Sequence, residues 1–382
     1  MRILIATGIF KPELGGPATY AAELGKRLQS AGHNVSVITY SEKQVHDLDL
    51  GFHFPIIRII RQPSKLKNYL RYFWTVLSLM EGKDVIYTLD WFSAGLPVMV
   101  AAFLRRKKYI VRVGGGYIWE KYLSEGKPPV TLKDFYEKGI YKEYRIMYLL
   151  IKLVLRRASC VIFNSDEQRA LYEKFYGLKK TSTMYNPVPE SKLGTLVHTY
   201  KTEYTNRDKE IVFAGRFIKM KNAESVIKAF AKIKDQSFKL LLIGEGPTEP
   251  ELRTLVKEHE LGTRVEFHRP MSQTELYRRI ANCYYVILPS WTDISPNQIY
   301  ECLALSIPFL VTQENYLSIN KHNFLKVDPS SVDDIAEKMN NLLDQKQYEA
   351  FVQSLQKLEF NHTWTHVVMQ HMKIFNAAAK QQ

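Results

Sequence analysis

The chain contains two successive series of short apolar segments that alternate with amphipathic segments, and a polar stretch separates the two series. Short apolar runs between turn residues are typical of buried strands, and the segments between them have the spacing of helices. This alternation predicts a parallel sheet with helices on its faces, once for each series. A length of 382 residues also exceeds the usual size of one core. We therefore expect an α/β protein with two Rossmann-like domains.

The two series set the expected domain boundaries. The first, residues 1–188, has strand patterns at 2–6, 35–40, 56–60, 84–87, 109–113 and 160–163 and helical patterns at 18–31, 66–80, 92–105 and 141–157. Residues 189–209 are polar, contain proline and lose periodicity, as a linker does. The second, residues 210–360, has strand patterns at 210–214, 239–243, 264–267, 284–288 and 309–312 and helical patterns at 222–233, 249–260, 273–281, 332–343 and 348–358. A last helix is expected at 363–379, within residues 361–382.

The stretch from Leu288 to Pro308 combines a strand end, a polar loop and the start of a helix. Asp293 lies in the loop, Asn297 is placed to cap the helix, and Glu301 follows inside it. The first turn of a helix attracts phosphate, whereas acids near that turn suit hydroxyl groups. A phosphate with a sugar on each side, as in a nucleotide-sugar, meets both demands.

Glycine-containing loops follow three other strand patterns. Gly15-Gly16 precedes the first helix, Gly215-Arg216 begins a loop that ends at Lys221, and Gly244-Glu-Gly246 follows the strand at 239–243. Glycine lets the backbone approach a ligand closely. The spacing is not G-x-G-x-x-G, so the dinucleotide-binding motif is absent. The alternative for the Gly15-Gly16 loop taken alone is a glycine-rich turn and nothing more.

Taken in order, these residues resemble the retaining glycosyltransferases of family 4, which have the GT-B fold. Asp293 and Glu301 are similar to the Glu-x7-Glu signature of that family, and Gly215-Arg216-x4-Lys221 is similar to its Gly-Arg-x4-Lys motif. Gly244, Gly246 and Val265-Glu-Phe267 follow at family-like distances. The chain departs from the family at four places, which are Gly114 for a usual His, Asn222 for Gly, Asp293 for Glu, and Ile294-Ser-Pro for Phe-Gly.

The resemblance implies two domains that face a central cleft, with the last helix crossing back to the N-terminal domain. It implies that Arg216 and Lys221 bind the donor diphosphate, that Glu301 holds the ribose hydroxyls and that Asp293 holds a sugar hydroxyl. Further donor-binding residues would be Gly15, Gly16, Gly215, Gly244, Gly246, Ser295 and Asn297. No metal site and no cofactor beyond the nucleotide-sugar co-substrate are expected, because no Asp-x-Asp motif is evident and positive side chains can stabilise the leaving group.

The acceptor would bind to the N-terminal domain. Asp90, Tyr117 and Glu120 are candidate contacts, although Asp90 and Glu120 are equally well explained as loop carboxylates. Residues 117–145 form a long insert rich in Tyr, Lys and Glu, which we expect to be an irregular flap on the acceptor side. Two alternatives to a transferase stay open, namely a non-catalytic nucleotide-sugar-binding protein of the same fold and a sugar-nucleotide epimerase.

Positive charge is concentrated in the N-terminal half. Residues 1–185 contain 29 Lys and Arg against 16 Asp and Glu, whereas the remainder contains 24 against 23. Much of this charge lies in 65–72, 105–108 and 141–157, and the last of these is amphipathic. Such a helix either packs on the sheet or lies at an anionic membrane surface, and different faces can do both. No nucleic-acid-binding module is recognised, so no nucleic acid is expected.

We accordingly expect a lipid-linked or cell-surface glycan as the acceptor, as in polysaccharide biosynthesis of the cell envelope. The first strand pattern begins at Arg2, so no signal peptide is expected, and the longest apolar run, 96–104, is too short to span a bilayer. Cys160, Cys283 and Cys302 are far apart and suit buried, reduced thiols. These features predict a cytoplasmic protein, with the inner face of the cell membrane as its contact surface.

Overall fold

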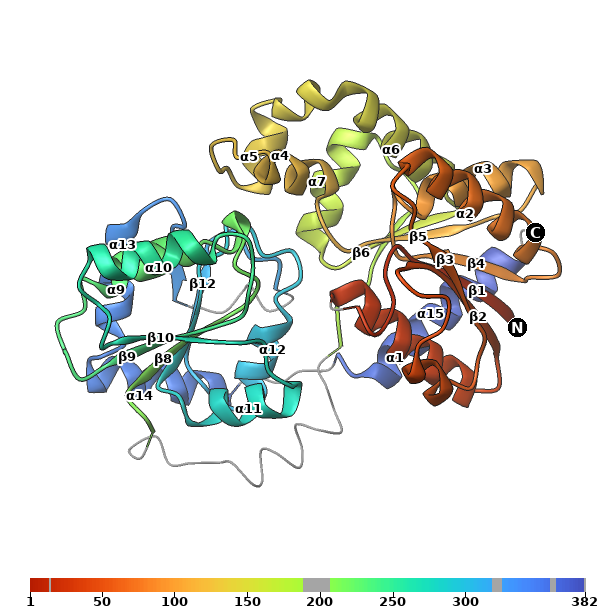
Figure 1. Cartoon of the computed structure of the whole chain (residues 1–382). Helices are drawn as coiled ribbons and strands as arrows, with labels where there is room; N and C mark the ends of the chain where they lie inside the picture. Colours follow the sequence, from red (N-terminus) through yellow and green to blue (C-terminus); the bar gives the residue numbers. More distant parts are fainter. Residues whose placement is uncertain (14, 188–206, 318–324, 358–361, 381–382) are drawn as a thin grey trace. The chain divides into compact units, whose positions relative to one another are not determined.

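The structure is a computed structural model that describes residues 1–13, 15–187, 207–317, 325–357 and 362–380 (Figure 1). It divides into two compact units. Unit 1 comprises Met1–Ile118, Tyr136–Tyr185 and Thr365–Gln382, and unit 2 comprises Trp119–Phe135 and Asn186–Trp364. The segment 119–135, expected in the N-terminal domain, is thus grouped with unit 2. Most of the predicted linker 189–209, namely residues 189–206, lies outside the described residues.

Unit 1 is built on a seven-stranded parallel sheet with the order β3-β2-β1-β4-β5-β6-β7. The strands are β1 (Arg2–Ala6), β2 (Asn34–Ser41), β3 (Ile56–Ile60), β4 (Val85–Thr88), β5 (Ile110–Val113), β6 (Cys160–Phe163) and β7 (Thr181–Thr183). The central strand β1 pairs Ile3 with Val35 of β2 on one side and with Val85 of β4 on the other. The six predicted strands are confirmed. The edge strand β7 was not predicted, because its three half-buried residues form no apolar run.

The helices of unit 1 cover both faces of this sheet. They are α1 (Gly16–Ser30), α2 (Lys65–Leu79), α3 (Gly95–Leu104), α6 (Arg145–Arg157), α7 (Asp166–Tyr176) and α15 (Trp364–Ala379), with the short turns η1 (Asp47–Gly51) and η2 (Ile140–Tyr144). The chain moves outward from β1 to β3 and then from β4 to β7, and right-handed crossovers place α1 on one face and α2, α3 and α6 on the other. Helix α3 contacts both α2 and α6.

The insert at 117–145 is not irregular. It contains α4 (Tyr117–Ser124), α5 (Leu132–Glu137) and η2, which passes directly into α6. The prediction was wrong because aromatic and aliphatic residues of the insert, namely Ile118, Trp119, Tyr122, Leu123, Phe135 and Tyr136, are buried. Their spacing of three to four residues favours helices over the turn that Gly126-Lys-Pro-Pro129 suggests.

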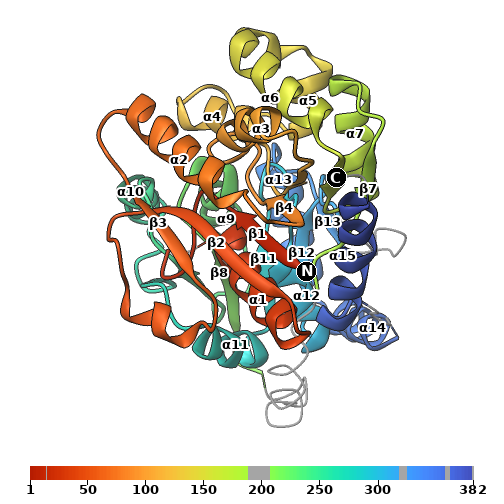
Figure 2. The same ribbon diagram turned by 90° about the vertical axis from the view of Figure 1, so that its right-hand side faces the viewer.

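The C-terminal helix α15 is part of unit 1 and lies beside α1 (Figures 1 and 2). The ring of His371 lies between Tyr20 of α1 and Tyr87 of β4, with centroid distances of 6.0 and 5.3 Å. Its Nε2 is 3.0 Å from the Tyr87 hydroxyl, and burial lowers the pKa of His371 to about 3. The neutral imidazole and the neighbouring Phe375, which is fully buried, therefore help to form the core of this unit.

Unit 2 has a six-stranded parallel sheet with the order β10-β9-β8-β11-β12-β13. Its strands are β8 (Glu210–Ala214), β9 (Lys239–Ile243), β10 (Val265–His268), β11 (Tyr285–Leu288), β12 (Phe309–Thr312) and β13 (Lys326–Val327). Its helices are η4 (Lys219–Lys221), α9 (Ala223–Phe230), α10 (Glu249–Glu258), α11 (Gln273–Asn282), α12 (Asn297–Ala304), α13 (Val332–Asn341) and α14 (Gln345–Gln356). The predicted strands are confirmed, and the two-residue β13 was missed. Among the described residues, no helix has the length and apolar character needed to cross a bilayer.

Replacing Phe375 by alanine tests whether α15 is a core element of unit 1. The Phe375 ring lies 5.3 Å from Tyr87 and 5.4 Å from His371. We expect Phe375→Ala to lower the free energy of unfolding of unit 1 by about 3–5 kcal/mol in urea denaturation. The exposed Met369 on the same helix is the control, and Met369→Ala should change it by less than about 0.5 kcal/mol. Equal effects of the two variants would contradict a core role for α15.

Candidate functional site

The sequence-predicted site residues of unit 2 follow two strands that are neighbours at the centre of the sheet. From β8 the chain continues to β9 and β10 on one side, and from β11 it continues to β12 and β13 on the other. The loops after β8 and β11 therefore diverge, and in open parallel sheets this topological switch point is where ligands bind. The sequence leads from β8 to Gly215, Arg216 and Lys221 and from β11 to Ser290 and Asp293.

The loop after β8 is braced by the loop after β9. Phe217 N donates to Glu245 O at 2.9 Å, and Gly215 N donates to Ile243 O at the same distance. A Cβ atom at Gly244 would lie 2.0 Å from Gly215 O, and one at Gly246 would lie 2.3 Å from Phe217 O. Close approach of the two backbones thus explains both glycines. By contrast, a Cβ at Gly215 would meet nothing closer than 4.0 Å, so no close packing requires that glycine.

The two basic side chains of this loop have different surroundings. Lys221 Nζ lies 3.6 Å from Asp293 Oδ2 and 3.3 Å from Ser290 Oγ, so its ammonium joins the loops after β8 and β11. Arg216 is exposed, and within the described residues its guanidinium makes no hydrogen bond or ion pair. An exposed guanidinium in the same loop as an ion-paired ammonium can bind an anion without first breaking a contact of its own.

Asn222, where the family has glycine, keeps the backbone conformation that glycine allows. Its φ is 59° and its ψ is 33°, the left-handed region that asparagine tolerates better than most residues. Its Nδ2 donates to Pro289 O at 3.1 Å and to Pro329 O at 2.8 Å. The substitution therefore preserves the turn and adds a tie between the loop after β8 and the loop after β11.

Both acids of the signature are buried, with exposed fractions of 6% for Asp293 and 8% for Glu301. Glu301 Oε1 accepts hydrogen bonds from the Tyr277 hydroxyl at 3.0 Å and from Gln273 Nε2 at 3.5 Å. Burial raises the pKa of Glu301 to about 7, and the hydrogen bonds from Tyr277 and Gln273 oppose this shift. Burial thus brings the ionisation of the Glu301 carboxyl into the neutral pH range.

The start of α12 differs from the prediction. Asn297 is the first residue of the helix, Pro296 occupies the N-cap position, and no side chain caps the helix. Instead, Asn186 Nδ2 donates to Asn297 Oδ1 at 2.9 Å and to Ser295 Oγ at 2.5 Å. The cap prediction was wrong because a residue more than a hundred positions away binds the Asn297 side chain. The N–H groups of the first turn are left without a side-chain cap.

The remaining candidate residues lie around the corresponding switch point of unit 1, between β1 and β4. Gly15 and Gly16 end the loop after β1. Asp90, after β4, accepts from Phe92 N at 2.7 Å and from Ser93 N at 2.8 Å through Oδ1, and Ser93 Oγ donates to its Oδ2. A Cβ at Gly8 would lie 2.4 Å from Asp90 Oδ2. Asp90 therefore organises its own loop and packs against the loop after β1.

The other two acceptor candidates, Tyr117 and Glu120, lie one turn apart in α4. Tyr117 lies in unit 1, where its ring stacks on Phe92 at a centroid distance of 4.7 Å. Glu120 is exposed and belongs to unit 2. Gly114 has open space around it, because a Cβ there would meet nothing nearer than Asn164 Nδ2 at 4.0 Å. Tyr117 is thus brought close to the Asp90 loop, because Phe92 lies in that loop.

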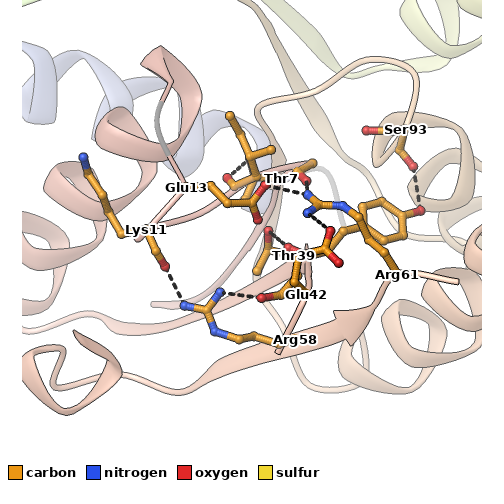
Figure 3. A network of polar contacts seen from close by, with 12 residues as sticks. Thr7, Lys11, Glu13, Thr39, Glu42, Arg58, Arg61 and Ser93 are labelled. Atoms are coloured by element: carbon orange, nitrogen blue, oxygen red, sulfur yellow. Dashed lines mark hydrogen bonds and ion pairs between the residues drawn. The ribbon is translucent and has the colours of Figure 1, made fainter. Parts of the chain in front are cut away.

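Two arginines that the sequence analysis did not single out hold the loop after β1 (Figure 3). Arg58 Nη2 donates to Lys11 O at 2.6 Å. Arg61 Nη2 donates to Glu13 Oε2 at 2.7 Å, and its Nη1 donates to Glu42 Oε1 at 3.0 Å. The signal that could have found Arg58 is a charged residue inside the apolar strand β3, since buried charges are paired.

Comparison with known proteins shows the class to which this architecture belongs. Over 99% of this chain and all of the compared chain, the structure matches the Anabaena protein HepE in complex with UDP, with a TM-score of 0.73 and 17% identity. Sucrose-phosphate synthase from Thermosynechococcus elongatus matches over both full lengths with a TM-score of 0.75 and 18% identity. At these identities the similarity establishes the fold. The chain has the GT-B fold, with two Rossmann-like parallel-sheet domains.

Sequence comparison gives the family. The model for glycosyl transferases group 1 matches residues 199–357, and the model for glycosyltransferase family 4 matches residues 14–192. Two uncharacterized glycosyltransferases of Methanocaldococcus jannaschii are 25% and 24% identical over 64% and 99% of this chain, which spans 63% and 98% of their lengths. The alpha-monoglucosyldiacylglycerol synthase of Streptococcus pneumoniae is 23% identical over 83% of this chain and over 72% of the length of the synthase. The chain is a glycosyltransferase and belongs to the GT-B enzymes similar to family 4.

Glu301→Gln provides a test of the electrostatic cost of the buried acid. The unfolded chain ionises Glu301 near pH 4.5 and the folded chain near pH 7, so the wild-type protein loses stability as the pH rises through this window. The gap corresponds to roughly 3 kcal/mol as an upper bound. We expect Glu301→Gln to be more stable than wild type at pH 8, with a difference that shrinks toward pH 4.5 in urea denaturation. The exposed Glu258→Gln is the control, and a pH-independent difference for Glu301→Gln would contradict the raised pKa.

Proposed function

We propose that the protein transfers a sugar, with retention of anomeric configuration, from a nucleotide-diphosphate donor to an acceptor hydroxyl. The observation that carries this proposal is the arrangement at the switch point of unit 2. There Lys221 contacts both Ser290 and Asp293, the exposed Arg216 lies in the same loop as Lys221, and α12 begins without a side-chain cap. This set of groups suits a diphosphate with hydroxyl-bearing sugars on each side.

The chemistry follows from these groups. When the bond between the anomeric carbon and the diphosphate oxygen breaks, negative charge builds on that oxygen. Arg216 and Lys221 supply positive charge, and the positive end of the α12 dipole adds to it, so the proposal needs no metal ion. The acceptor oxygen forms its bond to the anomeric carbon on the same face, and its proton passes to a donor phosphate oxygen. No protein side chain serves as a general base.

In this proposal Glu301 binds the ribose hydroxyls and Asp293 binds a hydroxyl of the transferred sugar. A carboxylate that is already buried accepts hydroxyl hydrogen bonds without competition from water, so its contribution to specificity is large. Ser295, Asn297 and the glycine loops would border the same ligand. The UDP held by the Anabaena protein makes UDP-sugars the first donors to test.

The proposed acceptor is a lipid-linked or surface glycan, and the name of the Streptococcus relative, which describes a glycolipid product, supports a lipid. Unit 1 offers a surface for contact with an anionic membrane. Helices α2, α3 and α6 lie side by side on one face of its sheet, and the segments 65–79, 95–108 and 145–157 contain eleven Lys and Arg and no Asp or Glu. A basic surface of this kind is attracted to anionic lipid headgroups.

Large apolar side chains are exposed along each of these helices. They are Leu66, Leu70 and Trp74 on α2, Val100, Phe103 and Leu104 on α3, and Ile146, Leu149 and Leu153 on α6. On each helix the members follow one another at three or four residues, except that Leu104 directly follows Phe103, and this spacing places them on the side of the helix that faces away from the sheet. Trp74, Phe103 and Ile146 are 64%, 66% and 78% exposed. Apolar stripes among basic residues suit the boundary between headgroups and acyl chains.

The donor site is tested by Arg216→Ala, assayed as release of nucleoside diphosphate from a panel of sugar nucleotides with polyprenyl and glycan acceptors. We expect turnover to fall by about 100-fold or more, because a charge that stabilises the leaving group is removed. Stability should change by less than about 0.5 kcal/mol, because Arg216 is exposed. Lys219→Ala, an exposed cation in the same loop, is the control and should retain activity.

The outcomes of this assay separate the candidate functions. Loss in Arg216→Ala and in Glu301→Ala, with activity retained in Lys219→Ala, would support the transferase and identify its donor. Activity retained in a folded Arg216→Ala protein would overturn the role of that residue. Donor binding without release for any acceptor would favour a non-catalytic binding protein, and release of an isomerised sugar would favour an epimerase.

The membrane surface is tested by the triple variant Leu70→Ser, Phe103→Ser and Ile146→Ser. We expect its binding to phosphatidylglycerol vesicles to weaken by more than about tenfold, because apolar area no longer enters the interface. Wild-type binding should also fall as salt is raised and be weak on phosphatidylcholine vesicles. Leu48→Ser with Met369→Ser, which removes exposed apolar residues elsewhere on unit 1, is the control. Equal binding to both lipids, or equal losses in both variants, would contradict the proposal.

A further inference from the structure

One segment of the chain leaves unit 1 and returns to it. Residues Trp119–Phe135, here called the strap, belong to unit 2, although Ile118 and Tyr136 on either side belong to unit 1. The strap contains most of α4 and the start of α5. The sequence motifs did not predict that the strap contacts the rest of unit 2.

The strap is attached to unit 2 at the start of α5. Leu132 N donates to Thr292 Oγ1 at 2.8 Å, and Lys133 N donates to Glu314 Oε1 at 2.9 Å. The Thr131 side chain also forms a hydrogen bond with Glu314. Two successive N–H groups of a helix start, which need partners outside the helix, therefore bind side chains of the loops after β11 and β12.

Glu314 is the centre of this network. Besides Lys133 N, its Oε1 accepts from the Thr292 hydroxyl at 3.1 Å and from the Tyr316 hydroxyl at 3.1 Å. Burial raises the pKa of Glu314, and the hydrogen bonds from its four partners act in the opposite direction. A carboxylate suits this place because it only accepts, whereas an amide would turn an NH₂ group toward one of the donors.

The network ends at Asp293, the acid proposed to bind the donor sugar. Thr292 is its neighbour in the chain, Asp293 N donates to Glu314 O at 3.0 Å, and Tyr316 N donates to Asp293 O at 3.1 Å. Asp293 also forms an isolated parallel bridge with Asn315. Both backbone polar groups of Asp293 are thus bound to the segment that carries Glu314. The neighbouring Thr292 side chain is bound by the strap.

We propose that Glu314 is a positioning residue, which joins the strap to the loop at 292–293 and so sets the Asp293 carboxylate for its contact with the donor sugar. The inference rests on the proposed role of Asp293 and extends it to residues that do not touch the donor. It assigns the insert at 117–145 to donor recognition through its strap portion, in addition to the expected acceptor side.

The experiment compares Glu314→Gln with wild type in the full chain, with UDP and the UDP-sugar found active as separate probes. We expect affinity for the UDP-sugar to fall about tenfold, while affinity for UDP stays within about twofold, because the network acts only on the group that contacts the sugar. Hydrogen exchange at the amides of Leu132 and Lys133 should become faster. If Glu314 only stabilised the fold, its replacement would not lower the affinity for the UDP-sugar more than the affinity for UDP.

Two substitutions at Thr292 test the same network if the Glu314→Gln protein does not fold. Thr292→Val removes the hydroxyl at nearly constant volume and should reproduce the selective loss, whereas Thr292→Ser should retain wild-type affinity. The double variant Thr292→Val with Glu314→Gln should lose little more UDP-sugar affinity than either single variant, because both substitutions interrupt the same network. Glu210→Gln is the matched control, since Glu210 is paired with Arg279 at 3.2 Å at the start of β8, the opposite end of that strand from the site.

Each remaining outcome overturns the inference. If UDP-sugar affinity is unchanged in Glu314→Gln while hydrogen exchange in the strap becomes faster, Glu314 only holds the strap and does not position Asp293. Equal losses for UDP and UDP-sugar would indicate general disruption of the site. If wild type binds UDP but no UDP-sugar, the proposed function fails together with the role of Asp293, and this result differs from a failure of Glu314 alone.

Discussion

The constraint on which the site depends is the reversal of strand order at the centre of each parallel sheet. Because β8 and β11 are neighbours but lead to opposite sides of the sheet, the loops that follow them cannot cover each other. Lys221 and Asp293 arise from these two loops and meet at 3.6 Å. The same reversal between β1 and β4 in unit 1 exposes the Asp90 loop beside the loop after β1. Catalytic chemistry can therefore vary in the loops while apolar strands preserve the fold.

The site concentrates acids in places where folding alone would disfavour them. Asp293, Glu301 and Glu314 all lose solvent, and burial raises the pKa of Glu301 and of Glu314. Each acid is supported differently, Asp293 by an ammonium, Glu301 by Tyr277 and Gln273, and Glu314 by donors from the strap. Groups retained at such a cost usually serve binding or catalysis rather than stability.

The sequence was sufficient for the parts of the fold that depend on local patterns. The main strands of both sheets, the loop that carries Arg216 and the helix that carries Glu301 could be predicted, because apolar runs, helical spacing and glycine turns are local signals. The strap and the start of α12 could not. The strap depends on hydrogen bonds between residues about 160 and 180 positions apart, and Asn186 displaces the expected cap from 111 positions away. Such pairings have no periodicity to detect.

Two of the four departures from the family motif, Asn222 and Asp293, affect how the loops of the site are held. Asn222 adopts a left-handed backbone conformation that glycine readily allows, and its side chain ties two loops together. Asp293 is one methylene shorter than the usual glutamate, so its reach depends more directly on the position of its backbone. The chain binds that backbone through both its N–H and its C=O to the segment around Glu314, and the strap fixes the residue before it. A shorter acid on a better-fixed backbone can direct its carboxylate with fewer rotamers, which reduces the entropy lost when a sugar hydroxyl binds.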